Sequence, residues 1–161
     1  MDGISEILAT YNCVSLDEKI QFELDGVVEK EIKQAYCIEN LEFCVSCMDY
    51  TTLKVSDTEE SVKNFTADLL KKLKKFNLRD VAAVCVFSNY AGIVREGLKG
   101  TEIQTAVVAG NFPNSQTFTE IKLAECKMAI GAGAQEVDVV ISVGDILEKN
   151  YPQACRKMGI S

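Results

Sequence analysis

The sequence predicts an α/β protein of the (β/α)8 barrel type, of which this chain supplies about the first four βα units. Apolar, strand-like runs alternate with helical patterns, and each βα step takes roughly 30 to 35 residues. One run, residues 81–87, is apolar throughout, which is typical of a parallel strand buried on both faces. Acidic and thiol side chains lie at or near strand ends, as expected for groups that face the inside of a barrel.

The composition indicates a globular protein with room for one domain core. The chain has 161 residues, of which 47% are hydrophobic and 25% are charged. Its net charge of −7 argues against nucleic acid or an anionic membrane as a partner. No apolar run approaches the roughly 20 residues of a membrane helix, and residues 1–20 do not resemble a signal peptide. The seven scattered cysteines therefore predict reduced thiols in a cytoplasmic protein.

Histidine is absent, which removes Ser-His-Asp and Cys-His catalysis and most zinc sites. Cys44 and Cys47 form a CxxC motif, but no second pair lies at the spacing of a zinc finger. The motif falls in a strand-like run, in which the two side chains would point to opposite faces. We therefore predict ordinary buried cysteines here, and no metal site.

The chain divides into a predicted N-terminal helical extension, residues 1–40, and a barrel part, residues 41–161. Residues 6–9 have helical character, and apolar side chains recur at helical spacing over residues 16–35. No chemistry is assigned to this extension.

The first βα unit is predicted from a strand over residues 41–49, which Asp49 ends. After a loop over residues 50–54, Ser56 and Glu59 match an S-x-x-E capping box that opens a helix. The helix has an apolar stripe at helical spacing. The stripe comprises Val62, Phe65, Leu69, Leu73 and Phe76.

The second unit consists of the strand at residues 81–87 and a helix from Ser88 to about Leu98. Gly100 is expected to stop this helix. The third strand is predicted over residues 103–109, where the chain is again largely apolar.

The third helix is predicted to follow a loop over residues 110–116. Thr117 and Glu120 match a second capping box. The helix is expected to run to Ile130 and to stop at Gly131.

The fourth strand carries two acids on one face, Glu136 and Asp138, followed by Val140 and Ser142. The other face is entirely apolar, and comprises Val137, Val139, Ile141 and Val143. An acid inside such a strand requires a partner, a proton or water. Asp138 is therefore a candidate functional residue, whereas Glu136, at the strand entrance, is expected to be solvated or ion-paired. Residues 144–158 are expected to form one more turn or helix, which Pro152 breaks.

Five segments, in order, resemble deoxyribose-phosphate aldolase, a class I aldolase on a (β/α)8 barrel. They are Met48–Leu53, with its D-x-T-x-L motif, residues 81–86, Asn111–Pro113, Glu120–Ala132 and Gly133–Ile141. The resemblance covers about residues 43–150. The dinucleotide signature GxGxxG and the phosphate loop GxxxxGK[ST] are both missing, which disfavours a phosphate-binding domain of the flavodoxin type.

The resemblance implies reversible cleavage of 2-deoxyribose 5-phosphate to glyceraldehyde 3-phosphate and acetaldehyde, through a lysine Schiff base and without a metal or organic cofactor. It implies that Asp138 is the carboxylate of the proton relay and that Asp49 supports it. Cys85, Thr51 and Leu53 would line the substrate pocket. From the residues alone, Asp49 is better explained as an N-cap or turn residue that closes a strand, and Cys85 as a core residue.

The motif that carries the family's Schiff-base lysine, K-[TS]-S-T-G, is absent from the 161 residues, and so are the glycine-rich phosphate loops. The lysines present, including Lys122, Lys127 and Lys149, are predicted on helix surfaces or loops, and none is selected as the nucleophile. We therefore expect the chain alone to be inactive. A half barrel exposes strand edges, so the chain should self-associate, pair with a complementary half or be marginally stable. Of these, we predict a homo-oligomer. A second interpretation stays open, a truncated or degenerate aldolase relative without enzymatic activity that acts, if at all, through association with a partner.

Overall fold

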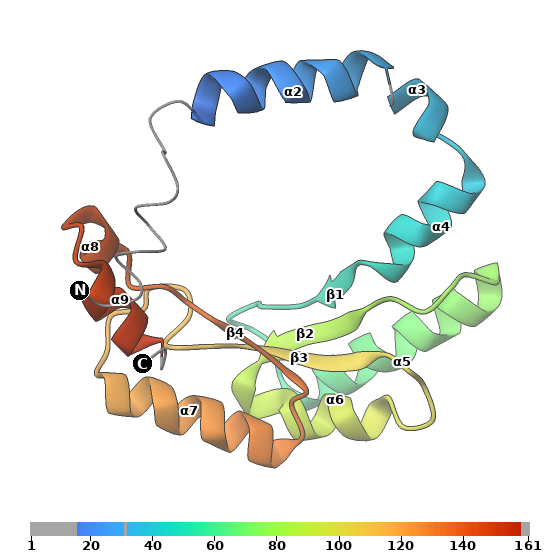
Figure 1. The fold of residues 1–161 in the computed structure, drawn as a ribbon. Coiled ribbons are helices and arrows are strands. Elements are labelled where there is room, and N and C mark those ends of the chain that lie inside the picture. The colour runs from blue at the N-terminus through green and yellow to red at the C-terminus, as the bar shows by residue number, and fades with distance from the viewer. Residues whose placement is uncertain (1–15, 31, 159–161) are drawn as a thin grey trace. The chain divides into compact units, whose positions relative to one another are not determined.

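The computed structural model describes residues 16–30 and 32–158, which Figure 1 shows as a ribbon. The chain divides into two compact units, Met1–Leu41 and Glu42–Ser161. The assignment of residues 1–40 as a separate helical extension stays a prediction. Of the helices in the described ranges, none has the length and apolarity needed to cross a membrane.

The first unit contains helices α2 (Leu16–Lys30) and α3 (Ile32–Ala35). Both lie where apolar residues recur at helical spacing. Gln21 donates a side-chain hydrogen bond of 2.9 Å to Asp25, one helical turn later. The helical character predicted for residues 6–9 lies outside the described residues.

Residues 38–46 form a helix, α4 (Ile38–Ser46), so the first strand predicted over residues 41–49 is wrong. The turn after this helix extends to Met48, whose amide donates to the carbonyl of Val45 at 3.1 Å. Strand β1 therefore begins only at Asp49 and comprises Asp49–Thr51. Leu41, Val45 and Met48 fit a helical spacing of four and three as well as a strand. A short apolar run does not distinguish the two by periodicity alone.

The second unit is built on a parallel sheet of β1, β2 (Ala83–Phe87), β3 (Gln104–Ala109) and β4 (Glu136–Val139), in that order. Every neighbouring pair is parallel. Helices separate the strands along the chain, so the predicted succession of βα units is confirmed. The right-handed crossovers typical of such units place these helices on one side of the sheet, as Figure 1 shows for α5, α6 and α7.

The outer face of the sheet packs against α5 (Glu59–Phe76), α6 (Ala91–Gly97) and α7 (Thr119–Ala132). A short 3-10 turn, η2 (Ser88–Tyr90), precedes α6. The core between the layers is apolar, because β2 and β3 contribute side chains that alternate toward it. Its fully buried strand members are Val84, Val86 and Val107.

Helix α5 buries most of the predicted stripe, with Val62, Leu69 and Leu73 in the core. Phe76 does not belong to it, because its side chain is 61% exposed at the end of the helix. Thr66 is buried instead, and its hydroxyl donates to the carbonyl of Val62 at 3.0 Å. A hydroxyl that is satisfied by its own helix can be buried at little cost.

The capping box of α5 is formed by Thr58 and Ser61, so the prediction of Ser56 with Glu59 is wrong. The hydroxyl of Thr58 accepts from the amide of Ser61 at 3.1 Å, and the hydroxyl of Ser61 accepts from the amide of Thr58 at 2.8 Å. Serine thus takes the role that glutamate has in the usual motif.

The predicted capping box of α7 is also wrong, because the N-cap is Phe118 and no side chain caps it. The helix passes the predicted stop at Gly131 and ends at Gly133, whose φ is +111°. The amides of Gly133 and Ala134 donate to the carbonyls of Ile130 and Ala129, both at 3.0 Å. This left-handed closure requires glycine at the position just after the helix.

Strand β4 ends at Val139, and two short helices follow, α8 (Val143–Leu147) and α9 (Tyr151–Lys157). The predicted continuation of the strand to residue 143 is wrong, since Ser142 is the N-cap of α8. Pro152 lies in the first turn of α9. It starts a helix there instead of breaking one, because the first turn needs no amide donor from it.

Two glycines at the end of α7 provide a test of this helix boundary. Gly133→Ala should lower the free energy of unfolding by about 1–2 kcal/mol, the cost of a left-handed conformation with a Cβ. That Cβ would also lie 3.0 Å from Cγ of Arg95. At Gly131 an added Cβ would meet nothing within 4 Å. Gly131→Ala should therefore raise the free energy of unfolding by roughly 0.5–1 kcal/mol. Urea unfolding followed by circular dichroism measures both, and equal effects would contradict the boundary.

Candidate functional site

The sheet face opposite the helices carries a small apolar cluster of its own. Ala83, Cys85, Ala106 and Val108 are buried there, and Leu53 and Phe87 pack against them. Because side chains alternate along a strand, Thr51 and Asp138 belong to this face as well. All five predicted site residues therefore lie on or beside one face, the inner face. They are Asp49, Thr51, Leu53, Cys85 and Asp138.

The strand register sets the rows in which these side chains lie. Thr51 is paired with Cys85, Cys85 with Ala106, and Ala106 with Glu136. Asp138 is paired with Val108, two residues further along. Asp138 thus lies in the row next to that of Cys85, nearer the carboxyl ends of the strands.

The thiol of Cys85 is affected by the carboxylates of this face. Burial, above all, and then the carboxylates of Asp138 and Asp49 raise the pKa of the Cys85 thiol to about 11, from 9.0. A hydrogen bond with Thr51 acts in the opposite direction, and Glu136 adds a smaller upward effect. A thiol with this pKa is neutral near pH 7, so Cys85 is poorly suited to act as a nucleophile.

Asp49 begins strand β1, which differs from the predicted position at the end of a strand. It pairs with Ala83 and is exposed. Thr51 and Asp138 are exposed as well, whereas Leu53 is half-buried. Charged side chains in these positions remain solvated, so no desolvation cost is paid for them in the described chain.

The loop after β1 is held by Asp57, a residue that the sequence analysis did not select. The Asp57 carboxylate accepts from the hydroxyl of Thr52 and from the amide of Lys54, both at 2.9 Å. The hydroxyl of Tyr90 donates to the Asp57 carbonyl at 2.7 Å. These bonds fix the loop that carries Leu53. An aspartate within reach of upstream loop amides is a known turn signal, and could have indicated this role.

Glu125 on α7 holds the carboxyl ends of β2 and β3 in a similar way. One of its oxygens accepts from the amides of Gly110 and Asn111, at 2.9 and 3.1 Å. The other accepts from the hydroxyl of Ser88 at 2.9 Å. Charge-assisted bonds of this kind are about twice as strong as neutral ones, so Glu125 is a strong positioning element for both strand ends.

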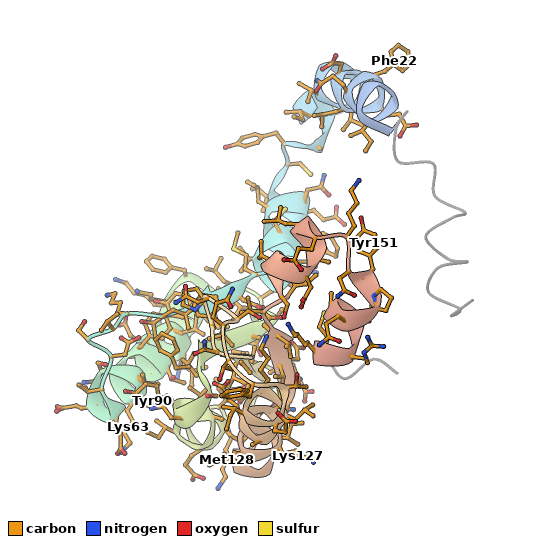
Figure 2. The ribbon with its side chains drawn as sticks, turned by 90° about the vertical axis from the view of Figure 1, so that its left-hand side faces the viewer. Phe22, Lys63, Tyr90, Lys127, Met128 and Tyr151 are labelled. Atoms are coloured by element: carbon orange, nitrogen blue, oxygen red, sulfur yellow. The ribbon has the colours of Figure 1, made fainter. Side chains whose placement is uncertain are left out.

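A pocket of about 780 Å³ lies next to Glu125, at the carboxyl ends of β2 and β3. Phe87 and Phe112 meet edge to face in its wall, with ring centroids 6.3 Å apart. Met128, which projects from α7 (Figure 2), lines it as well. The pocket adjoins the inner face through Phe87 and Val108 but contains none of the predicted site residues.

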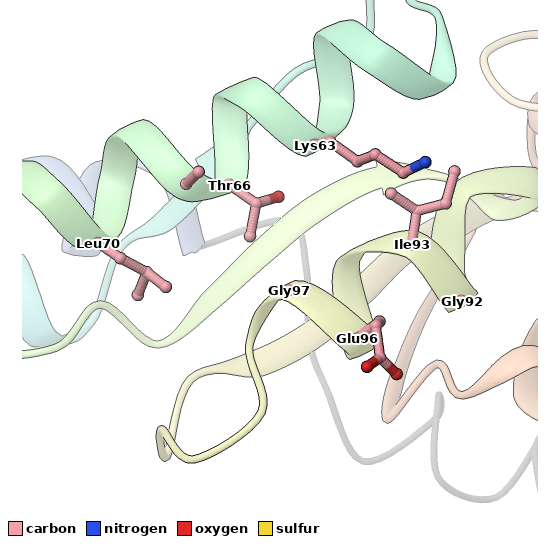
Figure 3. A pocket seen from close by; sticks show the side chains of 8 residues that line it. Lys63, Thr66, Leu70, Gly92, Ile93, Glu96 and Gly97 are labelled. Carbon is pink, nitrogen blue, oxygen red and sulfur yellow. The ribbon is translucent and has the colours of Figure 1, made fainter.

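A second hollow, of about 560 Å³, lies between α5 and α6. Figure 3 shows Lys63 and Glu96 among the side chains around it, with Leu70 and Ile93 as apolar lining. It belongs to the outer helical layer, so it is separate from the inner face.

Lys122 is buried, which corrects the prediction of a surface lysine. Only 2% of its surface is exposed. Its ammonium group donates to the hydroxyls of Ser115 and of Ser142, the latter at 3.3 Å. Ser115 in turn donates to the carbonyl of Val140 at 2.9 Å. Lys122 thereby ties the loop before α7 to the end of β4.

Burial is the main cause that lowers the pKa of Lys122. The neighbouring ammonium of Lys157 lowers it further, and Asp145 opposes the change. Asp145 is itself paired with Lys157 at 2.7 Å. The other two lysines named from the sequence, Lys127 and Lys149, are exposed as predicted, and Lys127 projects from α7 in Figure 2.

Cys44 and Cys47 are both exposed, which corrects the prediction of buried cysteines. The prediction failed because it depended on a strand at residues 41–49, where the structure has α4. Within residues 16–30 and 32–158, no three His, Cys, Asp or Glu side chains are grouped so that they could hold a metal ion.

Comparison with known proteins gives relatives that match about 65% of the chain. No family model matches the sequence. The deoxyribose-phosphate aldolase of Clostridium novyi is 43% identical over 104 residues, which are 65% of this chain and 43% of the relative. Those of Clostridium tetani and Streptococcus sanguinis are 40% and 36% identical over 104 residues, 65% of this chain and 44% of each relative. The chain thus spans less than half the length of these relatives.

Solved structures lead to the same family. A provisionally assigned deoxyribose-phosphate aldolase from Coccidioides immitis superposes with a TM-score of 0.62 at 26% identity, over 72% of this chain and 43% of that one. The tetrameric deoxyribose phosphate aldolase from Aeropyrum pernix superposes with a TM-score of 0.52 at 27% identity. The match covers 64% of this chain and 41% of that one. With the parallel sheet and its alternating helices, these neighbours confirm the predicted fold class, a partial (β/α)8 barrel.

The buried Lys122 should make the stability of the chain depend on pH. Between its lowered folded-state pKa and its ordinary value of 10.5, the unfolded chain binds more protons than the folded one. The free energy of unfolding therefore rises with pH in that window. Lys122→Met removes this contribution, so the wild type should gain stability over the variant as pH approaches 10.5. Urea titrations from pH 7 to 10.5 measure the difference. Lys127→Met, on the exposed side of the same helix, should show no such trend.

The convergence of charge on Cys85 predicts an order of thiol reactivity. Removing a carboxylate lowers the thiol pKa and increases the thiolate fraction, the species that reacts. Alkylation of Cys85 by iodoacetamide should therefore accelerate most in Asp138→Asn, less in Asp49→Asn and least in Glu136→Gln. Peptide mass spectrometry measures the rates at pH 8. Glu60→Gln, at the start of α5, is the control, and equal rates in Asp138→Asn and this control would contradict the inner-face geometry.

Proposed function

The chain is related to the deoxyribose-phosphate aldolases, and we propose on that basis that residues 41–161 form one half of such an enzyme's active site. The proposed reaction is the reversible cleavage of 2-deoxy-D-ribose 5-phosphate to glyceraldehyde 3-phosphate and acetaldehyde, through a Schiff base. The observation that carries the proposal is the inner face, where the charges of Asp138 and Asp49 both act on Cys85. A titratable group whose pKa is shifted by burial together with specific charged neighbours is more common at functional sites than elsewhere.

Asp138 is proposed to move the protons of water and of the carbinolamine that precedes the imine. A carboxylate in such a role needs access to the reacting atoms, and Asp138 is exposed on the open face. Asp49 is proposed to support it. The charges of both carboxylates act on the same thiol, that of Cys85.

Cys85, Thr51 and Leu53 are proposed to line the substrate pocket. The raised pKa of Cys85 supports a lining role over a nucleophilic one. Thr51 has a hydroxyl in the same row as Cys85, with which it is paired. Leu53 adds an apolar side chain next to that row. No metal and no organic cofactor is proposed.

The imine-forming lysine is proposed to come from outside the 161 residues. An amine becomes a nucleophile when desolvation or a neighbouring cation lowers its pKa. None of the strand residues on the inner face is a lysine. Lys122 has a lowered pKa, but two serine hydroxyls already accept from its ammonium group. We accordingly propose that the described residues alone do not catalyse the reaction.

Assembly with further copies is proposed as well. Among the described residues, β1 and β4 each pair with a neighbour on one side only. Unpaired strand edges favour association. The Aeropyrum pernix aldolase is described as tetrameric.

A chimeric enzyme tests the proposed function. Residues 43–150 would replace the matching segment of the Clostridium novyi aldolase, which supplies the remainder of the barrel. We expect the chimera to cleave 2-deoxyribose 5-phosphate. In it, Asp138→Asn should lower kcat by about 10²–10⁴-fold, the usual contribution of a proton-transfer group. Coupled detection of glyceraldehyde 3-phosphate measures the rate.

Glu60→Gln is the matched control in the chimera and should leave kcat unchanged. Full activity of Asp138→Asn would contradict the role of that carboxylate. Light scattering on the original chain, in which the edges of β1 and β4 are unpaired, tests the proposed assembly, and a monomer would contradict it. The original chain, treated with acetaldehyde and borohydride, should give no covalent adduct. An adduct mapped to one of its lysines would overturn the assignment of the nucleophile.

A further inference from the structure

Cys44 and Cys47 lie at the C-terminal end of α4, three residues apart. Cys44 is inside the helix and Cys47 is in the turn that follows it. The amide of Cys47 donates to the carbonyl of Cys44 at 3.1 Å, so this turn is closed. Residues three apart on a helix lie on one face, with Cβ atoms about 5–6 Å from one another. We propose that Cys44 and Cys47 are a redox modification site that forms a reversible disulfide.

The geometry suits this bond. A disulfide needs Cα atoms roughly 4.4–6.8 Å apart and Cβ atoms about 3.5–4.5 Å apart. One helical turn provides the first, and the second needs only a small shift of Cys47, which has already left the regular helix. Both side chains are exposed, so an oxidant can reach them.

The other described cysteines do not offer such a pair. Cys37 is exposed but precedes α4, seven residues before Cys44. Cys85 is buried, and Cys126 and Cys155 are partly buried. Burial also raises the pKa of Cys126, which disfavours its thiolate. The CxxC motif is therefore the one place in residues 32–158 where two exposed thiols share a turn.

The reaction balances with a low-molecular-weight disulfide as the oxidant. The thiolate of one cysteine attacks this disulfide, forms a mixed disulfide and releases one small thiol. The second cysteine then attacks the protein sulfur of the mixed disulfide and releases the other small thiol. The two protein thiols lose two protons and two electrons, and the oxidant gains them. An excess of small thiol reverses both steps.

The position of the pair at a helix C-terminus separates this site from a disulfide oxidoreductase. Catalytic CxxC motifs use a helix N-terminus, where the helix dipole stabilises the thiolate. At the C-terminus the dipole has the opposite sign. The pair is thus placed for reversible modification and not for catalysis of disulfide exchange.

The turn leads directly into the sheet. Met48, next to Cys47, accepts at its carbonyl from the amide of Ala82 at 3.0 Å, and Asp49 follows. A disulfide at residues 44 and 47 restrains the chain just before this contact. We therefore expect oxidation to slow the local opening of the start of β1.

The test uses the full chain, equilibrated with mixtures of oxidised and reduced glutathione and then quenched with acid. Peptide mass spectrometry should find a disulfide between Cys44 and Cys47, with the loss of two hydrogens. Cys44→Ser and Cys47→Ser should each abolish it and leave a glutathione adduct on the remaining cysteine. Cys37→Ser, the matched control, should leave it intact. Hydrogen exchange at the amide of Ala82 should be several-fold slower in the oxidised chain.

Two results would contradict the proposal. Glutathione adducts on Cys44 and Cys47 without a bond between them would overturn the disulfide. Exchange at Ala82 that does not change on oxidation would overturn its connection to β1. Neither result depends on aldolase activity, so this test is independent of the proposed function.

Discussion

The second unit depends on a parallel sheet that is covered on one face only. Val84, Val86 and Val107 are completely buried between the sheet and its helices, and burial of such side chains contributes about 1.5–3 kcal/mol each. The inner face adds only a smaller buried cluster, which comprises Ala83, Cys85, Ala106 and Val108. The exposed positions of the inner face are therefore free to carry groups that do not stabilise the fold. Asp49 and Asp138 are exposed there. Their negative charges contribute to the raised pKa of the Cys85 thiol.

Three charged side chains position the strand ends around that face. Asp57 holds the loop after β1, Glu125 holds the ends of β2 and β3, and Lys122 joins the loop before α7 to the end of β4. Each has several hydrogen-bond partners. Lys122 is buried and the other two are partly buried, and polar groups with satisfied partners in such places rigidify their surroundings. A site on the inner face thus rests on loops that are fixed before any substrate or partner arrives. The redox site proposed at Cys44 and Cys47 would act at the opposite end of the sheet, on the start of β1.

The inner-face residues could be predicted because the alternation of side chains along a strand is a local rule. Asp138 and Glu136 share a face in any strand that contains both, and Cys85 lies in a run that is recognisable as a buried parallel strand. The same rule failed at residues 41–49. Their apolar spacing fits a helix and a strand equally, and the structure has the helix. The exposed thiols of Cys44 and Cys47 follow from that difference.

The sequence by itself determined the succession of βα units, the apolar outer layer and the face on which the candidate acids lie, because these depend on periodicity over a few neighbouring residues. Only the tertiary structure decided which polar side chains are buried. Lysine is a residue type that usually lies on the surface. The burial of Lys122 depends on two serines, seven residues before it and twenty after it. No local pattern contains that pairing. It exists only because β4 and the loop before α7 are brought together, and the desolvation cost of the ammonium group is offset only where those hydroxyls meet it.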